Sequence, residues 1–327
     1  MNFNCEKTCS NPELKDILAL ISKKLALASP TPHLDAELIL MHVLKKPRHW
    51  LYLNHKTRIN FKQKQKILKL TKERTKNRLP MAYLTGVKNF YGLRFKINKN
   101  TLIPRPETEL LVDEILRALE IIQHPKNRAA NNRSILIADI GTGTGCIIIA
   151  CAKNIKDKKH LSFIATDKNK KTLDLARKNL KNHGLEKIIQ LKKAGLLAAL
   201  SKKNLKKFQY LIISANLPYL SARKYQKTQP EIKHEPRQAL IASDSGAGLI
   251  KKALTQIFKI KQQLASLNIQ AFFEIDPGQR KLLKRFIKEK QKSSPCLSSF
   301  NVQFKKDLNQ RWRLLKLSSD KLKKSQK

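Results

Sequence analysis

From residue 135 onward, short apolar runs alternate with longer stretches of helical periodicity, and this alternation constrains the fold more than any other feature. The apolar runs cover residues 135–140, 162–166, 210–215 and 270–275. The helical stretches cover residues 146–153, 170–183 and 249–264. Strands joined by helices pair in parallel, because each helix carries the chain back to where the next strand begins. We therefore predict an α/β fold with a mostly parallel sheet, closed by an antiparallel pair at residues 302–304 and 313–317.

The first eighty residues follow a different pattern. Apolar side chains recur there at the three-and-four spacing that lines one face of a helix, at Leu14, Ile17, Leu18, Ile21 and Leu25. Thr31 and Asn60 are residue types that begin helices. Between residues 87 and 103 the periodicity falls to two, which is typical of strands. The predicted organisation is a helical domain at residues 1–80, a β connector at 81–104, the α/β domain at 105–317 and a basic, disordered tail at 318–327.

The charge balance is strongly positive. The chain has 68 Lys and Arg residues against 24 Asp and Glu residues, a formal net charge of +44. Such a surplus favours a nucleic-acid or ribosomal neighbourhood. Lysine is nevertheless spread over nearly every helical stretch, which fits a genome-wide compositional bias equally well. Both interpretations stay open, and no pattern in the sequence indicates an oligomeric state.

No sequence feature indicates export, membrane insertion or metal binding. The first residues lack an apolar run, and the longest apolar stretch, residues 146–152, is too short to cross a bilayer. The five cysteines form no C-x-x-C pair and the eight histidines no H-E-x-x-H pattern, so we expect no metal site. We expect a protein of the reducing cytoplasm.

The sharpest local motif is a glycine loop, D-I-G-T-G-T-G at residues 139–145, which follows the first apolar run. Ligands of open α/β sheets bind beyond the carboxyl ends of the strands, and glycine lets the backbone approach a ligand with no Cβ in the way. Asp167 ends the second apolar run, 22 residues after Gly145. A carboxylate at that place can accept hydrogen bonds from both ribose hydroxyls of a nucleoside.

The glycine spacing bears on which nucleoside binds. A dinucleotide fingerprint, G-x-G-x-x-G, sets a helix N-terminus against a pyrophosphate. Here the third glycine comes one position early, and Cys146 takes its expected place. S-adenosylmethionine is a cation without a pyrophosphate and needs no such anion site. The loop therefore favours S-adenosylmethionine over a nicotinamide cofactor or a purely structural turn.

A second motif follows the run at residues 210–215: the tetrad Asn216-Leu217-Pro218-Tyr219. It resembles the N-P-P-Y box of methyltransferases that modify planar nitrogens. An amide nitrogen is a poor nucleophile, because its lone pair is delocalised into the carbonyl. The Asn216 side-chain oxygen and the Leu217 main-chain carbonyl can accept its two N–H groups, which holds the nitrogen in line with a methyl donor. Tyr219 would cover the planar group and exclude water.

With these motifs in place, the chain resembles the protein-(glutamine-N5) methyltransferases of peptide chain release factors, the family often called PrmC or HemK. The resemblance extends over most of the chain, and its most distinctive stretch is L-I-P-R-P-E-T-E at residues 102–109. The other matching stretches are residues 34–38, 42–44, 80–86, 90–92, 234–237, Glu274 and residues 306–308.

The resemblance implies a class I S-adenosylmethionine-dependent methyltransferase domain with a seven-stranded, mostly parallel sheet, and a helical N-terminal domain that docks class I release factors. The implied substrate is the glutamine of their Gly-Gly-Gln motif, with Asn216 as the catalytic residue. The implied substrate-binding residues are Asn216, Leu217, Pro218 and Tyr219. The implied cofactor-binding residues are Gly141, Thr142, Gly143, Thr144, Gly145, Asp167, Leu196 and Asn216.

Two positions depart from the family pattern. Leu217 stands where the tetrad usually has its first proline, which should weaken preorganisation by roughly 0.4–1 kcal/mol. Leu217 still precedes Pro218 and is therefore still biased toward an extended backbone. Gly195 stands where an acidic residue often binds the adenine amino group, although Leu196 can pack on the adenine ring.

Two other functions stay open on the sequence alone. A DNA adenine-amine methyltransferase uses a similar asparagine box and would suit the positive charge, but no separate target-recognition domain is visible. A non-catalytic RNA- or ribosome-binding protein on a degenerate methyltransferase scaffold would account for Leu217 and Gly195.

Overall fold

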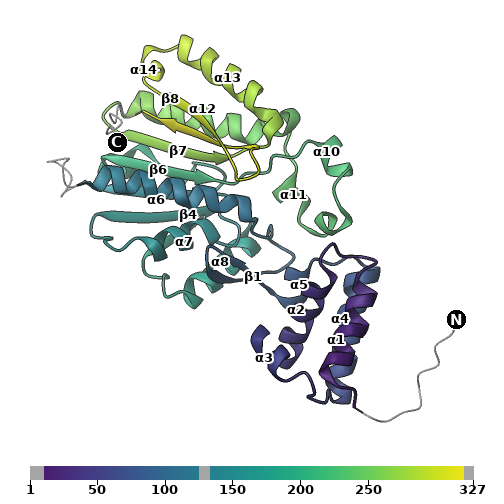
Figure 1. Ribbon diagram of the computed structural model, residues 1–327. Helices are drawn as coiled ribbons and strands as arrows, with labels where there is room; N and C mark the ends of the chain where they lie inside the picture. Colours follow the sequence, from purple (N-terminus) through teal and green to yellow (C-terminus); the bar gives the residue numbers. More distant parts are fainter. Residues whose placement is uncertain (1–10, 125–132, 320–327) are drawn as a thin grey trace. The chain divides into compact units, whose positions relative to one another are not determined.

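The protein is described by a computed structural model that covers residues 11–124 and 133–319 (Figure 1). It divides into two compact units. The helical unit runs up to Val87 and also includes Gln229–His234, and the sheet unit comprises Lys88–Thr228 and the chain from Glu235 onward. The functional domain boundaries predicted at residues 80, 104 and 317 stay a proposal. The predicted disordered tail lies outside the described residues from residue 320 onward, whereas Ser318 ends a strand.

Five helices form the main part of the helical unit: α1 (Leu14–Leu25), α2 (Pro32–Leu44), α3 (Arg48–Leu53), α4 (Phe61–Lys76) and α5 (Met81–Thr85). The apolar stripe predicted from the sequence is the buried face of α1, where Leu14, Ile17, Ile21 and Leu25 pack against Ile39 and Leu40 of α2 and Ile67 of α4. Asn60 begins α4 as expected, because its side chain accepts from the Gln63 N–H while the Gln63 side chain accepts from the Asn60 N–H.

A segment from much later in the chain completes the helical unit. The 3₁₀ helix η3 (Pro230–His234) brings Glu231 to the end of α4. Its Oε1 accepts from Arg74 Nη1 at 2.7 Å and lies 2.9 Å from Arg78 Nη2, while Arg74 Nε donates to Asp35 Oδ2 at 2.8 Å. A buried guanidinium needs such partners, because leaving it unpaired is costly. No local pattern in the sequence predicts this contact.

The stretch predicted as a β connector, residues 81–104, begins with helix α5, ahead of the strand periodicity noted between residues 87 and 103. Pro80 precedes this helix and Gly86, at φ 73°, ends it in the left-handed conformation. A hairpin of β1 (Val87–Phe90) and β2 (Leu93–Lys96) follows. Its turn residues Tyr91 and Gly92 have φ values of 51° and 71°, as the tight turn of a twisted hairpin requires. The predicted strand character is confirmed at residues 87–90 and 93–96, and residues 97–103 form no strand.

The sheet unit contains the predicted seven-stranded sheet. Its strands are β3 (Ile135–Ile140), β4 (Leu161–Asp167), β5 (Ile189–Lys193), β6 (Tyr210–Ala215), β7 (Asn268–Glu274), β8 (Asn301–Lys306) and β9 (Trp312–Ser318). They are ordered β5-β4-β3-β6-β7-β9-β8, with the first five parallel and β9 antiparallel to both neighbours. The chain moves outward from β3 on one side and then returns to continue on the other. This reversal puts a ligand-binding crevice at the carboxyl ends of β3 and its neighbours.

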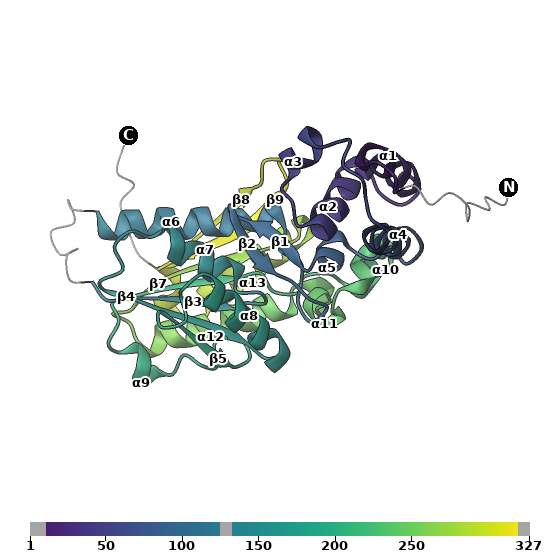
Figure 2. The same ribbon diagram turned by 90° about the horizontal axis from the view of Figure 1, so that it is seen from below.

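Helices cover both faces of this sheet (Figures 1 and 2). The helices α6 (Glu109–Gln123), α7 (Cys146–Asn154) and α8 (Lys170–Asn182) lie on one face, and α12 (Gly248–Gln263) and α13 (Arg280–Lys292) lie on the other. The remaining short elements are η1 (Pro106–Thr108), α9 (Lys202–Leu205), α10 (Ala222–Gln226), α11 (Arg237–Leu240), η4 (Asp244–Gly246), η5 (Pro277–Gln279) and α14 (Pro295–Ser298). Because both faces are covered, β3 and β6 are buried at every residue.

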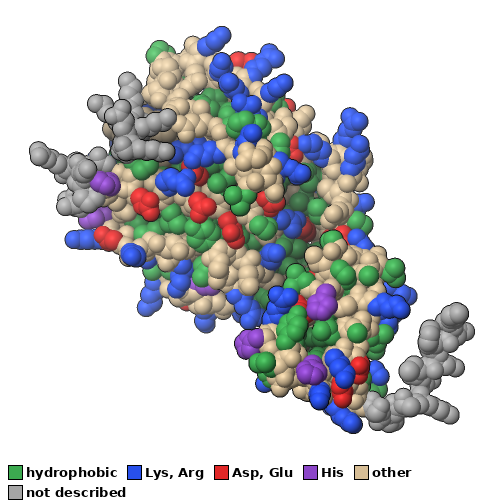
Figure 3. Space-filling model, in the orientation of Figure 1, with side chains coloured by type: hydrophobic (Ala, Val, Ile, Leu, Met, Phe, Trp, Pro, Cys, Tyr) green, Lys and Arg blue, Asp and Glu red, His purple; other side chains and the backbone are tan. Residues whose placement is uncertain are grey.

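In the part of the chain that the structure covers, no helix combines the length and the apolar character that crossing a bilayer requires. Figure 3 shows Lys and Arg side chains scattered over the visible face, with no single block that gathers them.

Candidate active site

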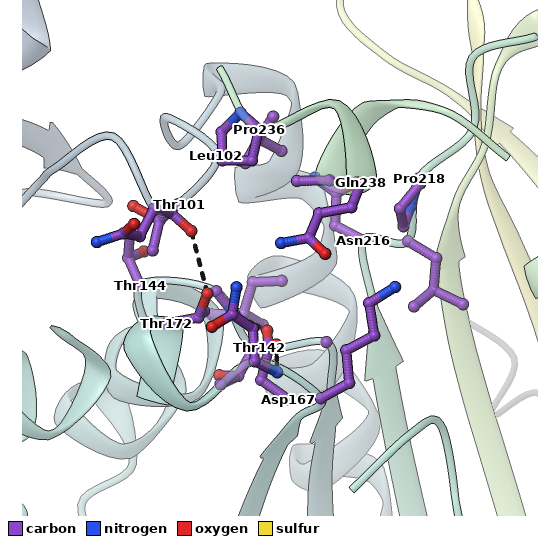
Figure 4. A pocket seen from close by; sticks show the side chains of 18 of the residues that line it. Thr101, Leu102, Thr142, Thr144, Asp167, Thr172, Asn216, Pro218, Pro236 and Gln238 are labelled. Carbon is purple, nitrogen blue, oxygen red and sulfur yellow. Dashed lines mark hydrogen bonds between the residues drawn. The ribbon is translucent and has the colours of Figure 1, made fainter. Parts of the chain in front are cut away.

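A pocket lies in the sheet unit at the carboxyl ends of its central strands (Figure 4). Its walls come from the loops after β3, β4, β5 and β6, from the chain between β2 and α6, and from the region around α11. Nine of the eleven site residues predicted from the sequence line it: Gly141, Thr142, Gly143, Thr144, Asp167, Leu196, Asn216, Leu217 and Pro218. Gly145 and Tyr219 do not.

The glycine loop connects β3 to α7 and owes its path to three left-handed residues. Gly141, Gly143 and Gly145 have φ values of 69°, 57° and 82°, which side chains rarely tolerate. Gly145 caps α7, and a Cβ there would lie 3.1 Å from Ile149, so this glycine serves helix packing and does not face the pocket. Gly141 and Gly143 present bare backbone to the pocket.

A buried carboxylate, Asp139 at the end of β3, anchors the glycine loop. Asp139 is fully buried; its Oδ2 accepts from the Thr142 hydroxyl at 2.6 Å and its Oδ1 from the Ser214 hydroxyl at 2.9 Å. It thereby joins the loop after β3 to the neighbouring strand β6. Burial raises the pKa of the Asp139 carboxyl to about 6, although the two hydroxyl donors act in the opposite direction. Asp139 belongs to the quoted loop motif, but no local pattern in the sequence indicates this role.

We expect Asp139 to make stability depend on pH. A carboxyl with a raised folded-state pKa stabilises the fold most below its unfolded pKa, and this contribution is lost as pH rises through the folded value. For a rise from 3.8 to about 6, the loss is about 3 kcal/mol. Urea unfolding between about pH 4 and pH 7 should therefore show the unfolding free energy of the wild type falling relative to that of Asp139→Asn. The exposed Asp157→Asn variant should follow the wild type, and parallel curves for Asp139→Asn would contradict this account.

Asp167 ends β4 and lies beside the glycine loop in the pocket lining. Its Oδ2 accepts from the Gly143 N–H at 3.2 Å and its Oδ1 from the Asn169 N–H at 2.9 Å. Burial raises the pKa of this carboxyl, while the two backbone donors lower it. Each oxygen retains a lone pair beyond these bonds. Asp167 could thus accept from the two hydroxyls of a ribose in the pocket.

Asn216 follows β6, next to the glycine loop because β3 and β6 pair in parallel. Its Nδ2 donates to the Thr108 hydroxyl at 3.0 Å. Its Oδ1 is buried and is one of the few buried side-chain atoms, among the described residues, for which no hydrogen-bond partner is found. A buried acceptor without a partner is costly and marks a place where a ligand can donate.

Leu217 and Pro218 of the tetrad line the pocket as predicted, whereas Tyr219 does not. Leu217 is buried, and its Cδ2 lies so close to the glycine loop that a Cβ on Gly141 would meet it at 3.1 Å. Tyr219 lies outside the pocket lining, where its hydroxyl donates to Glu274 Oε1 at 3.2 Å. The predicted role of Tyr219 in covering a planar substrate stays a prediction. Its ring is held by a buried carboxylate that sequence reasoning could not pair with it.

The amino-acid sequence matches known families and proteins. Residues 16–86 match the family described as the PrmC N-terminal domain, and residues 119–240 match the one described as the methyltransferase small domain. The release factor glutamine methyltransferase of Coxiella burnetii is 35% identical over 238 residues, which cover 73% of this chain and 78% of that protein. The one from Thermodesulfovibrio yellowstonii is 30% identical over 269 residues, 82% of this chain and 85% of that protein. The chain belongs to the release factor glutamine methyltransferase family.

Among solved structures, the hMettl16 catalytic domain in complex with the MAT2A 3′UTR hairpin 6 matches with a TM-score of 0.48 at 15% identity. The match covers 79% of this chain and 81% of that one, and a score of this size supports no conclusion about function. The family assignment comes from the sequence relatives and agrees with the resemblance inferred from the motifs.

Two stretches first noted through the resemblance to the release factor glutamine methyltransferases are tied together beside the pocket. These are residues 102–109 and 234–237. The buried Glu235 accepts from the Ile103 N–H at 2.9 Å through Oε2, and its Oε1 is paired with the Arg105 guanidinium. One carboxylate thus fixes a loop that lies about 130 positions earlier in the chain.

Several pocket residues were not predicted. They include Leu102, Pro236 and Gln238, which are labelled in Figure 4. Lys168 lines the same cavity. Leu102 and Pro236 belong to the matching stretches 102–109 and 234–237, whereas Lys168 and Gln238 directly follow quoted residues, but only the folded chain brings all four to one cavity.

The part of the pocket wall that follows β5 contains Gly195, the second position at which this chain departs from the family pattern. Leu196 lines the pocket with φ 48°, and its carbonyl accepts from the Thr166 hydroxyl at 3.3 Å. A Cβ on the neighbouring Gly195 would have no atom within 4 Å. This wall therefore has open space where an acidic side chain would fit.

Over residues 11–124 and 133–319, no group of three or more His, Cys, Asp or Glu side chains is arranged to hold a metal ion.

Proposed function

We propose that this protein transfers the methyl group of S-adenosylmethionine to the side-chain amide nitrogen of the glutamine in the Gly-Gly-Gln motif of class I peptide chain release factors. The observation that carries the proposal is the buried, unpartnered Oδ1 of Asn216 in a pocket that the glycine loop and Asp167 also line. Family membership supports the same activity, since the relatives are named for it.

The pocket residues fit S-adenosylmethionine. Gly141 and Gly143 leave room for the ligand beside the backbone, and the Asp167 carboxylate matches a ribose diol. Leu196 offers an apolar surface to the adenine ring, with Thr142 and Thr144 beside the glycine positions. Gly145 contributes by capping α7. When bound, S-adenosylmethionine supplies an activated methyl group on a sulfonium centre.

The chain's own groups act on the glutamine amide. Asn216 Oδ1 accepts one N–H and the Leu217 carbonyl accepts the other, which orients the nitrogen and favours its pyramidal form. Pro218 restricts the Leu217 backbone to an extended conformation, so its carbonyl direction is largely set before substrate binds. No strong base is needed first, because the nitrogen becomes acidic only once it carries the methyl group. The N–CH₃ bond would form as the S–CH₃ bond breaks, S-adenosylhomocysteine would leave as the neutral thioether, and the proton lost from the nitrogen would pass to water. Tyr219 supports the tetrad through Glu274.

The remaining parts of the proposal concern partners and location. The helical unit, which matches the PrmC N-terminal domain, is the proposed docking site for the release factor. A substrate that acts in translation implies a cytoplasmic location and proximity to the ribosome, where a net charge of +44 would favour association.

The direct test is a transfer assay with methyl-labelled S-adenosylmethionine. The substrates are a class I release factor, the same factor with its Gly-Gly-Gln glutamine changed to alanine, duplex DNA, and ribosomes. We expect label on the intact factor alone, and mass spectrometry should find one added methyl group on that glutamine. Label on DNA alone would replace the proposal with an adenine-amine methyltransferase. Binding to ribosomes without any transfer would replace it with a non-catalytic role.

A further inference from the structure

The Asn216 side chain is one end of a buried chain of hydrogen bonds. Asn216 Nδ2 donates to Thr108 Oγ1 at 3.0 Å, and Thr108 Oγ1 donates to Glu274 Oε2 at 2.6 Å. Thr108 and Glu274 are only 2% and 1% exposed. The three residues come from the loop after β6, the end of η1 and the end of β7. The mechanism above uses only the first of them.

The direction of these hydrogen bonds determines which atom of Asn216 faces the pocket. An ionised carboxylate only accepts, so the single hydroxyl proton of Thr108 points at Glu274. The Thr108 oxygen can then only accept from Asn216, and the amide must turn its NH₂ group toward Thr108. The carbonyl oxygen Oδ1 is left facing the other way, buried and without a partner.

We propose that Glu274 and Thr108 are positioning residues that set the amide of Asn216 with its oxygen toward the substrate nitrogen. This inference rests on the proposed role of Asn216 as an acceptor for the glutamine amide. An inverted Asn216 would present NH₂ to NH₂, two donors that cannot bond, and would leave the substrate amide without its acceptor.

The same carboxylate also holds the far end of the tetrad. Glu274 Oε1 accepts from the Tyr219 hydroxyl at 3.2 Å, and the Tyr219 carbonyl accepts from Gln279 Nε2, also at 3.2 Å. Glu274 thus fixes Asn216 through Thr108 and fixes Tyr219 directly. Leu217, whose carbonyl is the second proposed acceptor, lies between these two anchored residues. One buried acid can therefore support both acceptors.

Protonation of Glu274 would remove the directionality. A protonated carboxyl can donate to Thr108, whose own proton is then free to bond Oδ1 of an inverted Asn216. The charged or titratable groups around Glu274 are Glu107 of η1, Arg313 of β9 and Tyr219 after β6. Burial and Glu107 raise the pKa of Glu274, while Thr108, Arg313 and Tyr219 lower it. Turnover is therefore expected to fall on the acid side as Glu274 takes up its proton.

The first test compares two variants of Thr108. Thr108→Val keeps the shape but removes the hydroxyl, so the Asn216 NH₂ loses its buried partner and inversion toward the pocket becomes favourable. We expect turnover to fall about 10- to 100-fold, with S-adenosylmethionine affinity changed less than about threefold. Thr108→Ser restores the hydroxyl and should retain turnover within about threefold of wild type. Equal losses in the two variants would overturn the proposal.

A double-mutant cycle separates positioning from general support of the fold. In an Asn216→Ala background, Thr108→Val should lower the residual turnover by less than about twofold, because there is no amide left to orient. Additive losses would show that Thr108 acts independently of Asn216 and would overturn the proposal.

A measurement on the protein without release factor tests the positioning role of Thr108 and Glu274 separately from the proposed methylation activity. The Asn216 side-chain ¹⁵N–¹H resonances, assigned by their absence in Asn216→Ala, should shift on acidification in the wild type and in Thr108→Ser. They should not shift in Thr108→Val or Glu274→Gln. A wild-type protein that methylates no release factor would refute the proposed function alone, whereas resonances indifferent to pH would overturn the positioning role.

Discussion

Replacing Asn216 with alanine should lower the turnover of release factor methylation by about 10²- to 10³-fold, the usual loss when one preorganised hydrogen-bonding group is removed from an active site. The substrate nitrogen would lose the acceptor that holds it in line, and a water molecule in its place would not be fixed in direction. S-adenosylmethionine affinity, measured by calorimetry, should change by less than about threefold, because Asp167 and the glycine loop are untouched.

The matched control is Asn154→Ala, which removes the same side chain from an exposed position at the end of α7. Its turnover and cofactor affinity should equal those of the wild type. A turnover for Asn216→Ala close to that of Asn154→Ala would remove Asn216 from the mechanism. A parallel loss of cofactor binding would instead make Asn216 chiefly a ligand of S-adenosylmethionine.

Gly246→Ala should be the most destabilising of the simple glycine substitutions. Gly246 has φ 90°, and a Cβ added to it would lie 2.0 Å from the Tyr219 carbonyl oxygen and 2.9 Å from Gln279 Nε2. The obstructing atom is backbone, so the tetrad itself must shift. We expect a loss of about 3 kcal/mol or more in unfolding free energy, and a melting temperature lower by roughly 10 °C for a unit of this size. Turnover should fall as well, since Tyr219 anchors the tetrad.

Gly184→Ala isolates the contribution of the backbone conformation. Gly184 has φ 68°, and a Cβ there would meet nothing within 4 Å. The unfolding free energy should fall only by the cost of placing alanine in the left-handed backbone conformation, roughly 1–2 kcal/mol. Turnover should not change. Thermal unfolding of both variants gives the comparison. Equal destabilisation would show that the contact with Tyr219 is not a constraint on the tetrad.

Much of the fold was predictable because the central strands are buried on both faces. The apolar runs at residues 135–140 and 210–215 begin and end at the same residues as strands β3 and β6. The strand β5 was missed because it lies at the sheet edge, where only the first of its five residues is buried. The helices α6 and α13 were also missed, although both have a buried apolar face at helical spacing that the same reasoning could have found.

The candidate site was predictable where its residues belong to local motifs at strand ends. The glycine loop, Asp167 and Asn216 follow β3, β4 and β6, and parallel pairing brings these ends to one edge of the sheet. Thr108 and Glu274 were noted only as positions that match the family, and their contacts could not be predicted, because these hydrogen bonds join residues 108 and 166 positions apart in the sequence. Such contacts depend on the packing of helix η1 against the end of β7, which no local pattern specifies.

The substitution of leucine for the usual proline at position 217 fits this picture. The contact proposed there is a main-chain carbonyl, which any residue supplies, and the buried Leu217 side chain packs against the glycine loop. The roughly 0.4–1 kcal/mol of preorganisation lost with the proline can be offset by anchors on both sides of it. The open space beside Gly195 has no such compensation, so cofactor affinity is the property in which this chain should differ from its relatives.

The most direct measurement is a crystal structure of the complex with S-adenosylhomocysteine and a peptide that contains Gly-Gly-Gln. We expect the ribose at Asp167 and the glutamine nitrogen at hydrogen-bond distance, about 2.7–3.2 Å, from Asn216 Oδ1. A nucleoside bound away from the glycine loop, or a glutamine amide that makes no contact with Asn216, would contradict this expectation.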